Sequence, residues 1–191
     1  INFVQDKRIY YGPLINEQSF NKVKEYNDMV LADKDAEVLL EPQYRKTDNN
    51  KAFYATPMVY KTEWRGCEAA YLREEVFGPH VAIIPFDTIE DAIHIYNDTD
   101  YGLAVGILTN DFRKARVMRD ECDAGMIYWN GGSIAAESHL AFGGVKKSGN
   151  GFPSAARTYQ AVTNEVSWTV NHADTLDFPQ GKQYLLYKNN K

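Results

Sequence analysis

The chain has 191 residues, of which 44% are hydrophobic and 25% are charged, and its formal net charge is −5. This composition predicts a globular protein with a sizeable core, while the acidic balance without clustered Lys and Arg argues against a nucleic-acid partner. No apolar run reaches the roughly 18 residues of a membrane span, so no membrane partner and a cytoplasmic location are expected. The two cysteines, Cys67 and Cys122, are expected to be free thiols.

The first third of the chain shows one helical pattern and two short extended ones. A helix is expected after a candidate N-cap, Asn16, because apolar residues then recur at helical spacing: Phe20, Val23, Tyr26 and Val30. Residues 37–41 and 58–62 are expected to be strands. The polar residues 42–56 between them are expected to form a loop.

From residue 81 onward, strands and helices are expected to alternate. The continuous apolar run 81–86 predicts a strand buried on both faces. Thr88 and Asp91 resemble a capping box for a helix through Ile89, Ala92, Ile93 and Tyr96. A strand at 103–109, a helix capped by Asn110 and a strand at 126–129 follow, the helix having Phe112, Ala115, Met118 and Cys122 on its apolar face. This alternation predicts an α/β domain with a parallel sheet, and ligands bind at the ends of such strands.

The last third is expected to be rich in loops and then extended. Six glycines predict loops over residues 130–158: Gly131, Gly132, Gly143, Gly144, Gly149 and Gly151. Val162, Val166, Trp168 and Val170 then alternate with polar residues, which predicts a long strand over 159–171 with one apolar face. An extended tail is expected after it.

Five segments, in this order along about residues 11–170, resemble the aldehyde dehydrogenase superfamily. They are YGPLIN at 11–16, EEVFGP at 74–79, YGLAVGILT at 101–109, AGMIYWN at 124–130 and AFGGVKKSGNG at 141–151. The resemblance implies an α/β fold, with residues 1–158 as the C-terminal part of a parallel-sheet, three-layer catalytic domain. It implies an oligomerisation strand at 159–172, through which the protein forms a homo-oligomer, and leaves 173–191 as the tail.

The resemblance also places candidate binding residues. Glu75 matches the glutamate that holds the nicotinamide ribose, since a carboxylate can accept two hydrogen bonds from a diol, and Phe77 matches an aromatic residue near the nicotinamide. The alternative is a surface glutamate and a core phenylalanine. Trp129 and Asn130 match a strand end that opens onto the substrate tunnel, and Phe142 matches the tunnel wall. Simple core packing is the alternative for Trp129.

The catalytic residues of the family have no counterpart in these 191 residues. The family's nucleophilic cysteine precedes the GPL segment, and its general-base glutamate and Gly-rich cofactor domain also lie upstream, so no catalytic residue is expected here. Cys67 and Cys122 are in other contexts and are expected to be inert. No metal site is expected from the four histidines, of which only His139, in the substrate-loop region, merits a test. Phe152 and Pro153 replace the Arg-Glu that many members have after SGxG, which leaves the subfamily open.

Two functions of different classes follow from these matches. The first is the C-terminal portion of an NAD- or NADP-dependent aldehyde dehydrogenase that oxidises a small-molecule aldehyde to a carboxylic acid, with the cofactor carrying the redox chemistry. The alternative is a truncated, non-catalytic structural or assembly subunit of the same family. The start at Ile1 without a Met indicates a fragment, a trimmed chain or a processed product. A general nucleotide-binding domain is disfavoured because no GxGxxG occurs.

Overall fold

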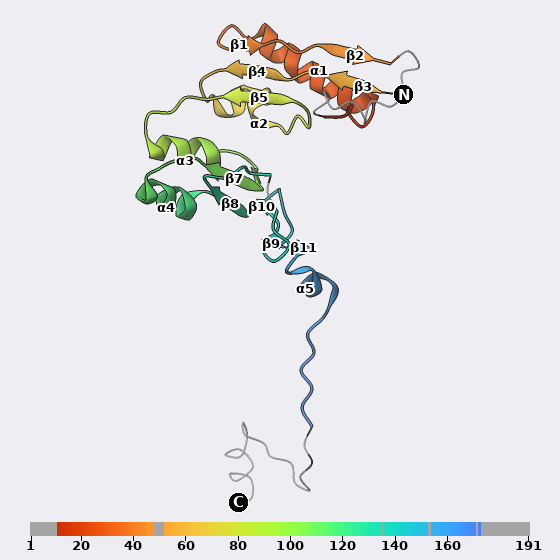
Figure 1. Ribbon diagram of the computed structural model, residues 1–191, viewed down its shortest axis with the longest axis vertical. Helices are drawn as coiled ribbons and strands as arrows, with labels where there is room; N and C mark the ends of the chain where they lie inside the picture. The colour runs from red at the N-terminus through yellow and green to blue at the C-terminus, as the bar shows by residue number, and fades with distance from the viewer. Residues whose placement is uncertain (1–10, 48–51, 135, 153, 171, 173–191) are drawn as a thin grey trace, which may run out of the picture.

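Two groups of strands and helices make up the chain, and the segment between β5 and α3 joins them (Figure 1). The computed structural model describes residues 11–47, 52–134, 136–152, 154–170 and 172, with the side chain of Cys67 excepted. The first group consists of α1 (Glu17–Ala32), β1 (Glu37–Leu40), β2 (Tyr44–Lys46), β3 (Phe53–Ala55), β4 (Met58–Lys61), α2 (Ala70–Arg73) and β5 (His80–Ile83). The second consists of α3 (Ile89–Asn97), β6 (Tyr101–Gly102), β7 (Ala104–Ile107), α4 (Phe112–Glu121), β8 (Met126–Trp129) and β10 (Val145–Lys146). Helices on parallel strand pairs confirm the α/β class.

Helix α1 forms where the apolar spacing predicts it. The Asn16 side chain accepts a hydrogen bond of 2.8 Å from the Ser19 amide, which satisfies one of the unpaired donors at the helix start. The buried stripe consists of Phe20, Val23, Asn27 and Val30. One of these four buried side chains is therefore an amide rather than a hydrocarbon.

The sheet of the first group has the strand order β1-β4-β5. Strand β1 is antiparallel to β4, and β4 is parallel to β5. The register places Val38, Tyr60 and Ala82 in one row across the sheet, and this row packs with Val30 and Tyr71 of the two helices. Since Cβ directions alternate along a strand, neighbouring residues point to the opposite face.

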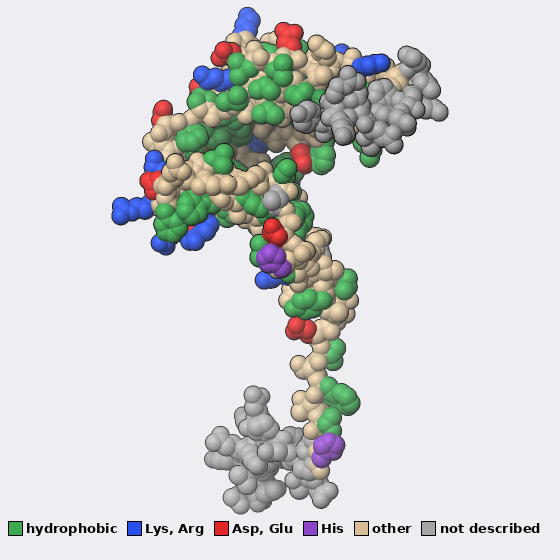
Figure 2. All heavy atoms as spheres, in the orientation of Figure 1, with side chains coloured by type: hydrophobic (Ala, Val, Ile, Leu, Met, Phe, Trp, Pro, Cys, Tyr) green, Lys and Arg blue, Asp and Glu red, His purple; other side chains and the backbone are tan. Residues whose placement is uncertain are grey.

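That opposite face is uncovered by the described residues. Val81 is 50% exposed and Ile83 is 45% exposed, so the prediction of a strand buried on both faces over 81–86 is wrong for this chain. The paired strand also ends at Ile83. Hydrophobic side chains lie on the visible surface over these strands in Figure 2. The apolar sequence of β5 is thus suited to two covered faces, but only the face toward α1 and α2 is covered.

The loop expected over residues 42–56 contains two strands instead. Strands β2 and β3 pair antiparallel, with Tyr44 opposite Ala55 and Lys46 opposite Phe53. Lys46 lies 5.5 Å from the centre of the Phe53 ring and forms an ion pair of 2.7 Å with Glu17. Strands of only three residues are too short to show a period-2 pattern, which is why the sequence indicated a loop.

The second group contains a β-α-β unit. Strands β7 and β8 are parallel and α4 connects them, while Val105, Ile107 and Cys122 form the core. The capping box of Thr88 and Asp91 at the start of α3 is confirmed. The cap of α4 is Asp111 and not Asn110, because α4 begins at Phe112 and the Asp111 carboxylate accepts from two amides of its first turn. Within the described part of the chain, no helix is both long and apolar enough to cross a membrane.

Arg73 and Trp64 of the first group bond to Asp98 of the second group, and two lysines bond within the second group. Arg73 donates to the Asp98 carboxylate at 3.1 Å, and Trp64 donates its indole N–H to the same carboxylate at 2.9 Å. Lys147 forms an ion pair of 2.6 Å with Asp100, and Lys146 donates to the Asn97 carbonyl at 2.8 Å. The two lysines of the AFGGVKKSGNG segment therefore have structural contacts.

The prediction of a long strand over 159–171 is wrong at its start, and the residues that follow pair with no other strand of the described residues. After β9 (Ala141–Phe142) and β11 (Ser154–Ala155), which pair antiparallel, α5 (Thr158–Val162) is a short helix. Residues 163–170 lead away from the body in an extended path and pair with no strand of the described residues (Figure 1). A period-2 pattern predicts which side chains share a face, but a ladder also needs a second strand. Residue 171 and the tail 173–191 lie outside the described residues.

A partly buried ion pair holds the C-terminal end of α1. Asp33 accepts a hydrogen bond of 2.6 Å from the Tyr71 hydroxyl and another from the Arg65 guanidinium. These two donors, Arg65 first, lower the pKa of Asp33 to about 2, and burial raises the pKa of Tyr71 to about 12. The pair connects the C-terminus of α1 to the segment that carries α2.

Asp33→Ala should therefore lower the free energy of unfolding at pH 7 by about 1.5–3 kcal/mol, since it removes the carboxylate that accepts from both the Arg65 guanidinium and the Tyr71 hydroxyl. The matched control is Asp35→Ala, because the Asp35 side chain is 78% exposed and its contact with Arg65 is longer, at 3.5 Å. The folded-state pKa of Asp33 is depressed, so its contribution is complete above the ordinary value of 3.8 and is lost as pH falls toward 2. Urea unfolding measures both variants, and equal effects would contradict this account.

Candidate functional site

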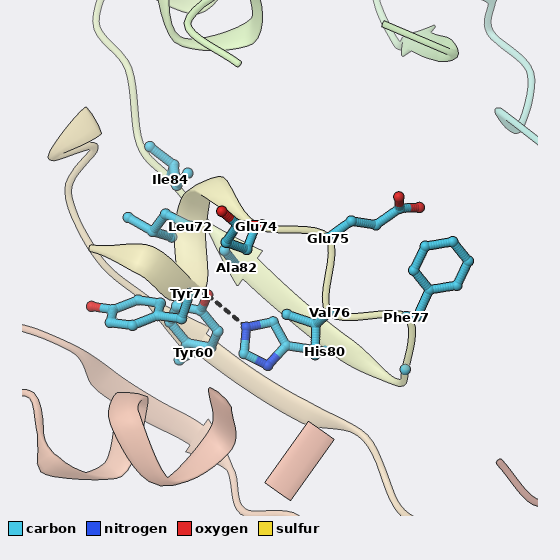
Figure 3. A pocket seen from close by; sticks show the side chains of 11 residues that line it. Tyr60, Tyr71, Leu72, Glu74, Glu75, Val76, Phe77, His80, Ala82 and Ile84 are labelled. Carbon is cyan, nitrogen blue, oxygen red and sulfur yellow. Dashed lines mark hydrogen bonds between the residues drawn. The ribbon is translucent and has the colours of Figure 1, made fainter. Parts of the chain in front are cut away.

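The loop 74–79 between α2 and β5 carries the two residues that match cofactor-binding positions. Glu75 and Phe77 are exposed, Phe77 by 73%, whereas Val76 between them is buried. Figure 3 shows the Glu75 carboxylate and the Phe77 ring on the same side of the loop, pointing away from Tyr60 and His80. The core phenylalanine considered as an alternative for Phe77 is therefore wrong.

The backbone at Phe77 is in the left-handed region, with φ of 55°. A residue other than glycine adopts this backbone conformation only at a cost in free energy, so the surrounding contacts must hold it there. None of the described residues donates a hydrogen bond to the Glu75 carboxylate. An unpaired carboxylate beside an exposed aromatic ring can accept from a vicinal diol and cover a flat heterocycle, which fits the ribose and nicotinamide of NAD(P).

Contacts with α1 and β4 fix both ends of this loop. Lys22 of α1 donates to the main-chain carbonyl of Glu75 at 2.7 Å. Gly78 lies so close to α1 that a Cβ on it would collide with the Val23 side chain. On the far side of the loop, the Met58 amide donates to the Pro79 carbonyl at 2.9 Å. The loop is therefore held from two directions.

A chain of buried polar side chains lies directly behind the loop. His80 Nδ1 is 2.8 Å from Asn27 Oδ1, and the Asn27 amide donates to the Tyr44 hydroxyl at 2.8 Å. The Tyr60 hydroxyl is 3.0 Å from His80 Nε2 (Figure 3). Asn27 and Tyr60 are fully buried. Because the Asn27 oxygen can only accept, His80 carries its proton on Nδ1, and Nε2 accepts from Tyr60.

His80 is therefore held in the neutral form. Desolvation by burial lowers its pKa from 6.5, and protonation of Nε2 would leave the buried Tyr60 hydroxyl without an acceptor. Tyr71, Glu74 and Glu75 line the same cavity of about 400 Å³ behind the loop. Burial also raises the pKa of Tyr60, so this hydroxyl stays protonated.

Sequence reasoning missed Asn27 and Tyr60 as partners of His80, and Tyr44 as the partner of Asn27. One signal was available, because Asn27 is a polar residue on the apolar stripe of α1, between Val23 and Val30. The tyrosines gave no such signal, since a tyrosine in a short strand is ordinarily a packing residue.

The protein should lose stability as pH falls below about 6.5, because the unfolded chain then binds a proton that folded His80 refuses. The folded pKa is depressed, so the stabilisation is complete above the unfolded value and is lost as pH falls through the folded value. His80→Gln should flatten this dependence when urea unfolding is compared between pH 5.5 and 7.5. A slope as steep as that of the unmodified protein would show that other groups cause it.

The segment after β8 forms a second, smaller cavity of about 180 Å³. Phe142 lines it, together with Gly125, Met126, Ile127, Tyr128, Ala136, Glu137, Leu140 and Ala141. Glu137 is the charged residue in this lining, and its carboxylate is 3.9 Å from His139 Nδ1. The walls are otherwise mostly apolar, which suits an organic substrate.

The structure does not bring Trp129 and Asn130 into that cavity. The Trp129 ring packs against Phe112 of α4 at 5.5 Å, and its indole N–H donates to the Thr109 carbonyl at 2.9 Å. Asn130, with φ of 52°, accepts from the Thr109 amide at 2.9 Å and donates to its carbonyl at 3.1 Å. Trp129 is 48% exposed, so it packs on the surface of α4 and not in the core, and both contacts of Asn130 lie at the end of β8.

The described thiol has the properties of a packing residue. Cys122 is buried in the core of the second group, and burial raises the pKa of its thiol, which disfavours the reactive thiolate. Cys67 falls in a 3₁₀ turn, Gly66–Glu68, and its side chain is not among those described. The described residues contain no group of three or more His, Cys, Asp or Glu that could hold a metal ion.

Sequence comparisons find relatives over most of this chain. Residues 3–167 match the profile of the aldehyde dehydrogenase family. A 1-pyrroline-5-carboxylate dehydrogenase of Staphylococcus haemolyticus is 31% identical over 153 residues, which is 78% of this chain and 28% of that protein. A 3-sulfolactaldehyde dehydrogenase of Priestia megaterium is 42% identical over 93 residues, or 49% of this chain and 20% of that protein. The chain thus spans less than a third of either relative.

Solved structures give the same result. An indole-3-acetaldehyde dehydrogenase of P. syringae, in complex with NAD+, superposes with a TM-score of 0.69 at 28% identity, covering 78% of this chain and 29% of that one. A putative aldehyde dehydrogenase of Burkholderia cenocepacia superposes with a TM-score of 0.68 at 30% identity, covering 78% and 30%. With a profile match over most of its length and the same arrangement of strands and helices, this chain belongs to the aldehyde dehydrogenase family.

Proposed function

We propose that this chain is the C-terminal portion of an NAD(P)-dependent aldehyde dehydrogenase that oxidises a small aldehyde to a carboxylic acid. The observation that carries the proposal is the loop 74–79, in which an unpaired carboxylate and an exposed aromatic ring are fixed side by side in a chain of this family. The bare apolar face over Val81 and Ile83 supports the C-terminal assignment, since a preceding segment could cover it. So does the coverage of the relatives, at 20% and 28% of their lengths.

In this proposal the chain supplies binding and orientation. NAD(P), when bound, accepts the hydride that leaves the substrate carbon. Glu75 accepts hydrogen bonds from the ribose hydroxyls, and the Phe77 ring packs against the nicotinamide end and excludes water. Phe142 and the apolar cavity beside it form part of the substrate tunnel. The nucleophile and the general base lie upstream, consistent with the burial of Cys122.

We also propose that residues 159–172 form a homo-oligomer contact. Val162, Val166, Trp168 and Val170 are exposed by between 51% and 87%, and their main-chain groups from 163 onward are unpaired within the described residues. An extended apolar stretch of this kind is an aggregation hazard unless another strand covers it. The same exposure is the observation that favours the alternative, a non-catalytic assembly subunit.

The 191-residue chain purified alone should oxidise no aldehyde, whereas the complete polypeptide that contains it should reduce NAD+ or NADP+. The reason is the absent nucleophile and base. Both proteins are assayed by absorbance of the reduced cofactor with short, aromatic and carboxylated aldehydes. Turnover by the isolated chain would overturn the upstream assignment, and an inactive complete polypeptide would favour the assembly subunit.

In the complete enzyme, Glu75→Gln should slow single-turnover hydride transfer on the order of a hundredfold while weakening cofactor binding much less. A misplacement of the reacting ring by about 1 Å is enough for such a loss. Glu74→Gln is the matched control, because this neighbouring carboxylate is exposed in the same loop. Equal rates for Glu75→Gln and the unmodified enzyme would rule out the ribose contact.

Trp168→Glu should lower the oligomeric state of the complete protein, because it places a charge on the face that the partner strand would bury. Thr169→Glu, on the opposite face of the same alternating pattern, should leave the assembly intact. Sedimentation at low micromolar protein measures both. If the mass of a folded Trp168→Glu variant is unchanged, this stretch is not an interface.

A further inference from the structure

The buried stripe of α1 contains one polar residue, and packing alone does not explain why it is there. Asn27 is fully buried in a helix that otherwise buries Phe20, Val23 and Val30. Burying an amide is unfavourable unless its polar atoms find partners. Its oxygen faces His80 Nδ1 at 2.8 Å and its nitrogen donates to the Tyr44 hydroxyl, so both ends are satisfied.

The partner of Asn27 is the first residue after the loop 74–79. The amide of His80 donates to the Gly78 carbonyl at 2.8 Å, which closes the turn that follows Phe77. The His80 ring is held on its other nitrogen by Tyr60, 3.0 Å away in the neighbouring strand β4. The ring therefore has a fixed rotation and a fixed tautomer, with one contact on the helix and one on the sheet.

Helix α1 contacts the segment 75–80 at three successive positions. Lys22 bonds the Glu75 carbonyl, Val23 contacts the main chain at Gly78, and Asn27 bonds His80. Of the three contacted loop positions, Glu75 precedes Phe77, Gly78 follows it, and His80 ends the segment. A left-handed residue such as Phe77 relaxes when its neighbours are released, because the conformation is unfavourable in itself.

We propose that Asn27 and His80 are positioning residues that lock the loop 74–79 in the conformation in which Glu75 and Phe77 meet the cofactor. The proposal rests on the proposed function for its catalytic consequence, but the lock itself is a property of this chain. Neither residue touches the reacting atoms. Both act through the main chain of the loop.

The test uses the complete polypeptide and three variants of α1. Asn27→Leu keeps the number and branching of the side-chain heavy atoms and removes both hydrogen bonds. Asn27→Asp keeps an oxygen for His80 and another for the Tyr44 hydroxyl, which can then donate. Asp28→Asn is the control, since Asp28 is the next residue on the helix, is exposed, and forms an ion pair of 3.4 Å with Lys24. The readouts are hydrogen exchange of the loop amides, the dissociation constant of NAD+ and single-turnover hydride transfer.

Asn27→Leu should accelerate hydrogen exchange in the loop by about tenfold or more, because a buried hydrogen bond is lost. Hydride transfer at saturating NAD+ should fall on the order of tenfold to a hundredfold, with little change in the dissociation constant. Asn27→Asp at pH 8 should restore most of both properties, and Asp28→Asn should change neither. A role confined to general stability would not separate hydride transfer from NAD+ affinity, nor would it be rescued by an isosteric carboxylate.

Unchanged exchange in a folded Asn27→Leu variant would overturn the lock. Faster exchange with undiminished hydride transfer would overturn the positioning role. If the unmodified polypeptide reduces no cofactor, the proposed function fails and the catalytic role fails with it, while hydrogen exchange still decides whether the lock exists. Should Asn27→Leu not fold, His80→Gln carries the same expectation, because its amide cannot bridge Asn27 and Tyr60 together.

Discussion

The contact between helix α1 and the segment that consists of α2, the loop 74–79 and β5 determines the arrangement of the first half of the molecule. Val30 and Tyr60, both fully buried, bring the helix onto the sheet, and the absence of a side chain at Gly78 lets the loop approach the Val23 side chain of the helix. Hydrophobic burial supplies most of the free energy of this contact. Polar contacts of Asn27, on the buried stripe of the helix, and of Asp33, at its C-terminal end, fix its register against the sheet.

The same contact explains why the candidate cofactor loop can be exposed and yet well defined. A loop that projects two side chains into solvent has few contacts of its own, and its conformation must come from the elements on which it rests. Here Val76 is buried beneath the loop, and hydrogen bonds on both sides hold the main chain. The exposed face of β5 shows the opposite situation, with apolar side chains that have no cover in the described residues.

Sequence patterns predicted the elements in which many local signals agree. Helix α3 has both a capping box and an apolar face, and the β7–α4–β8 unit follows from the alternation of periods. Strands β2 and β3 were missed because three residues are too few to show a period. Glu75 and Phe142 were assigned through the family resemblance, and they lie at an exposed loop and at a cavity wall. Trp129 packs on a helix instead. The sequence could not predict this position, because its neighbours in sequence do not reveal on which side of β8 it lies.

The central claim is that Glu75 anchors the ribose next to the nicotinamide, and a structure of the complete polypeptide with NAD+ or NADP+ tests it most directly. The account predicts both ribose hydroxyls within about 2.7–3.2 Å of the Glu75 carboxylate and the Phe77 ring against the nicotinamide, with Asn27 still bonded to His80. A bound cofactor whose ribose is held by other residues, with the Glu75 carboxylate in solvent, would contradict the account.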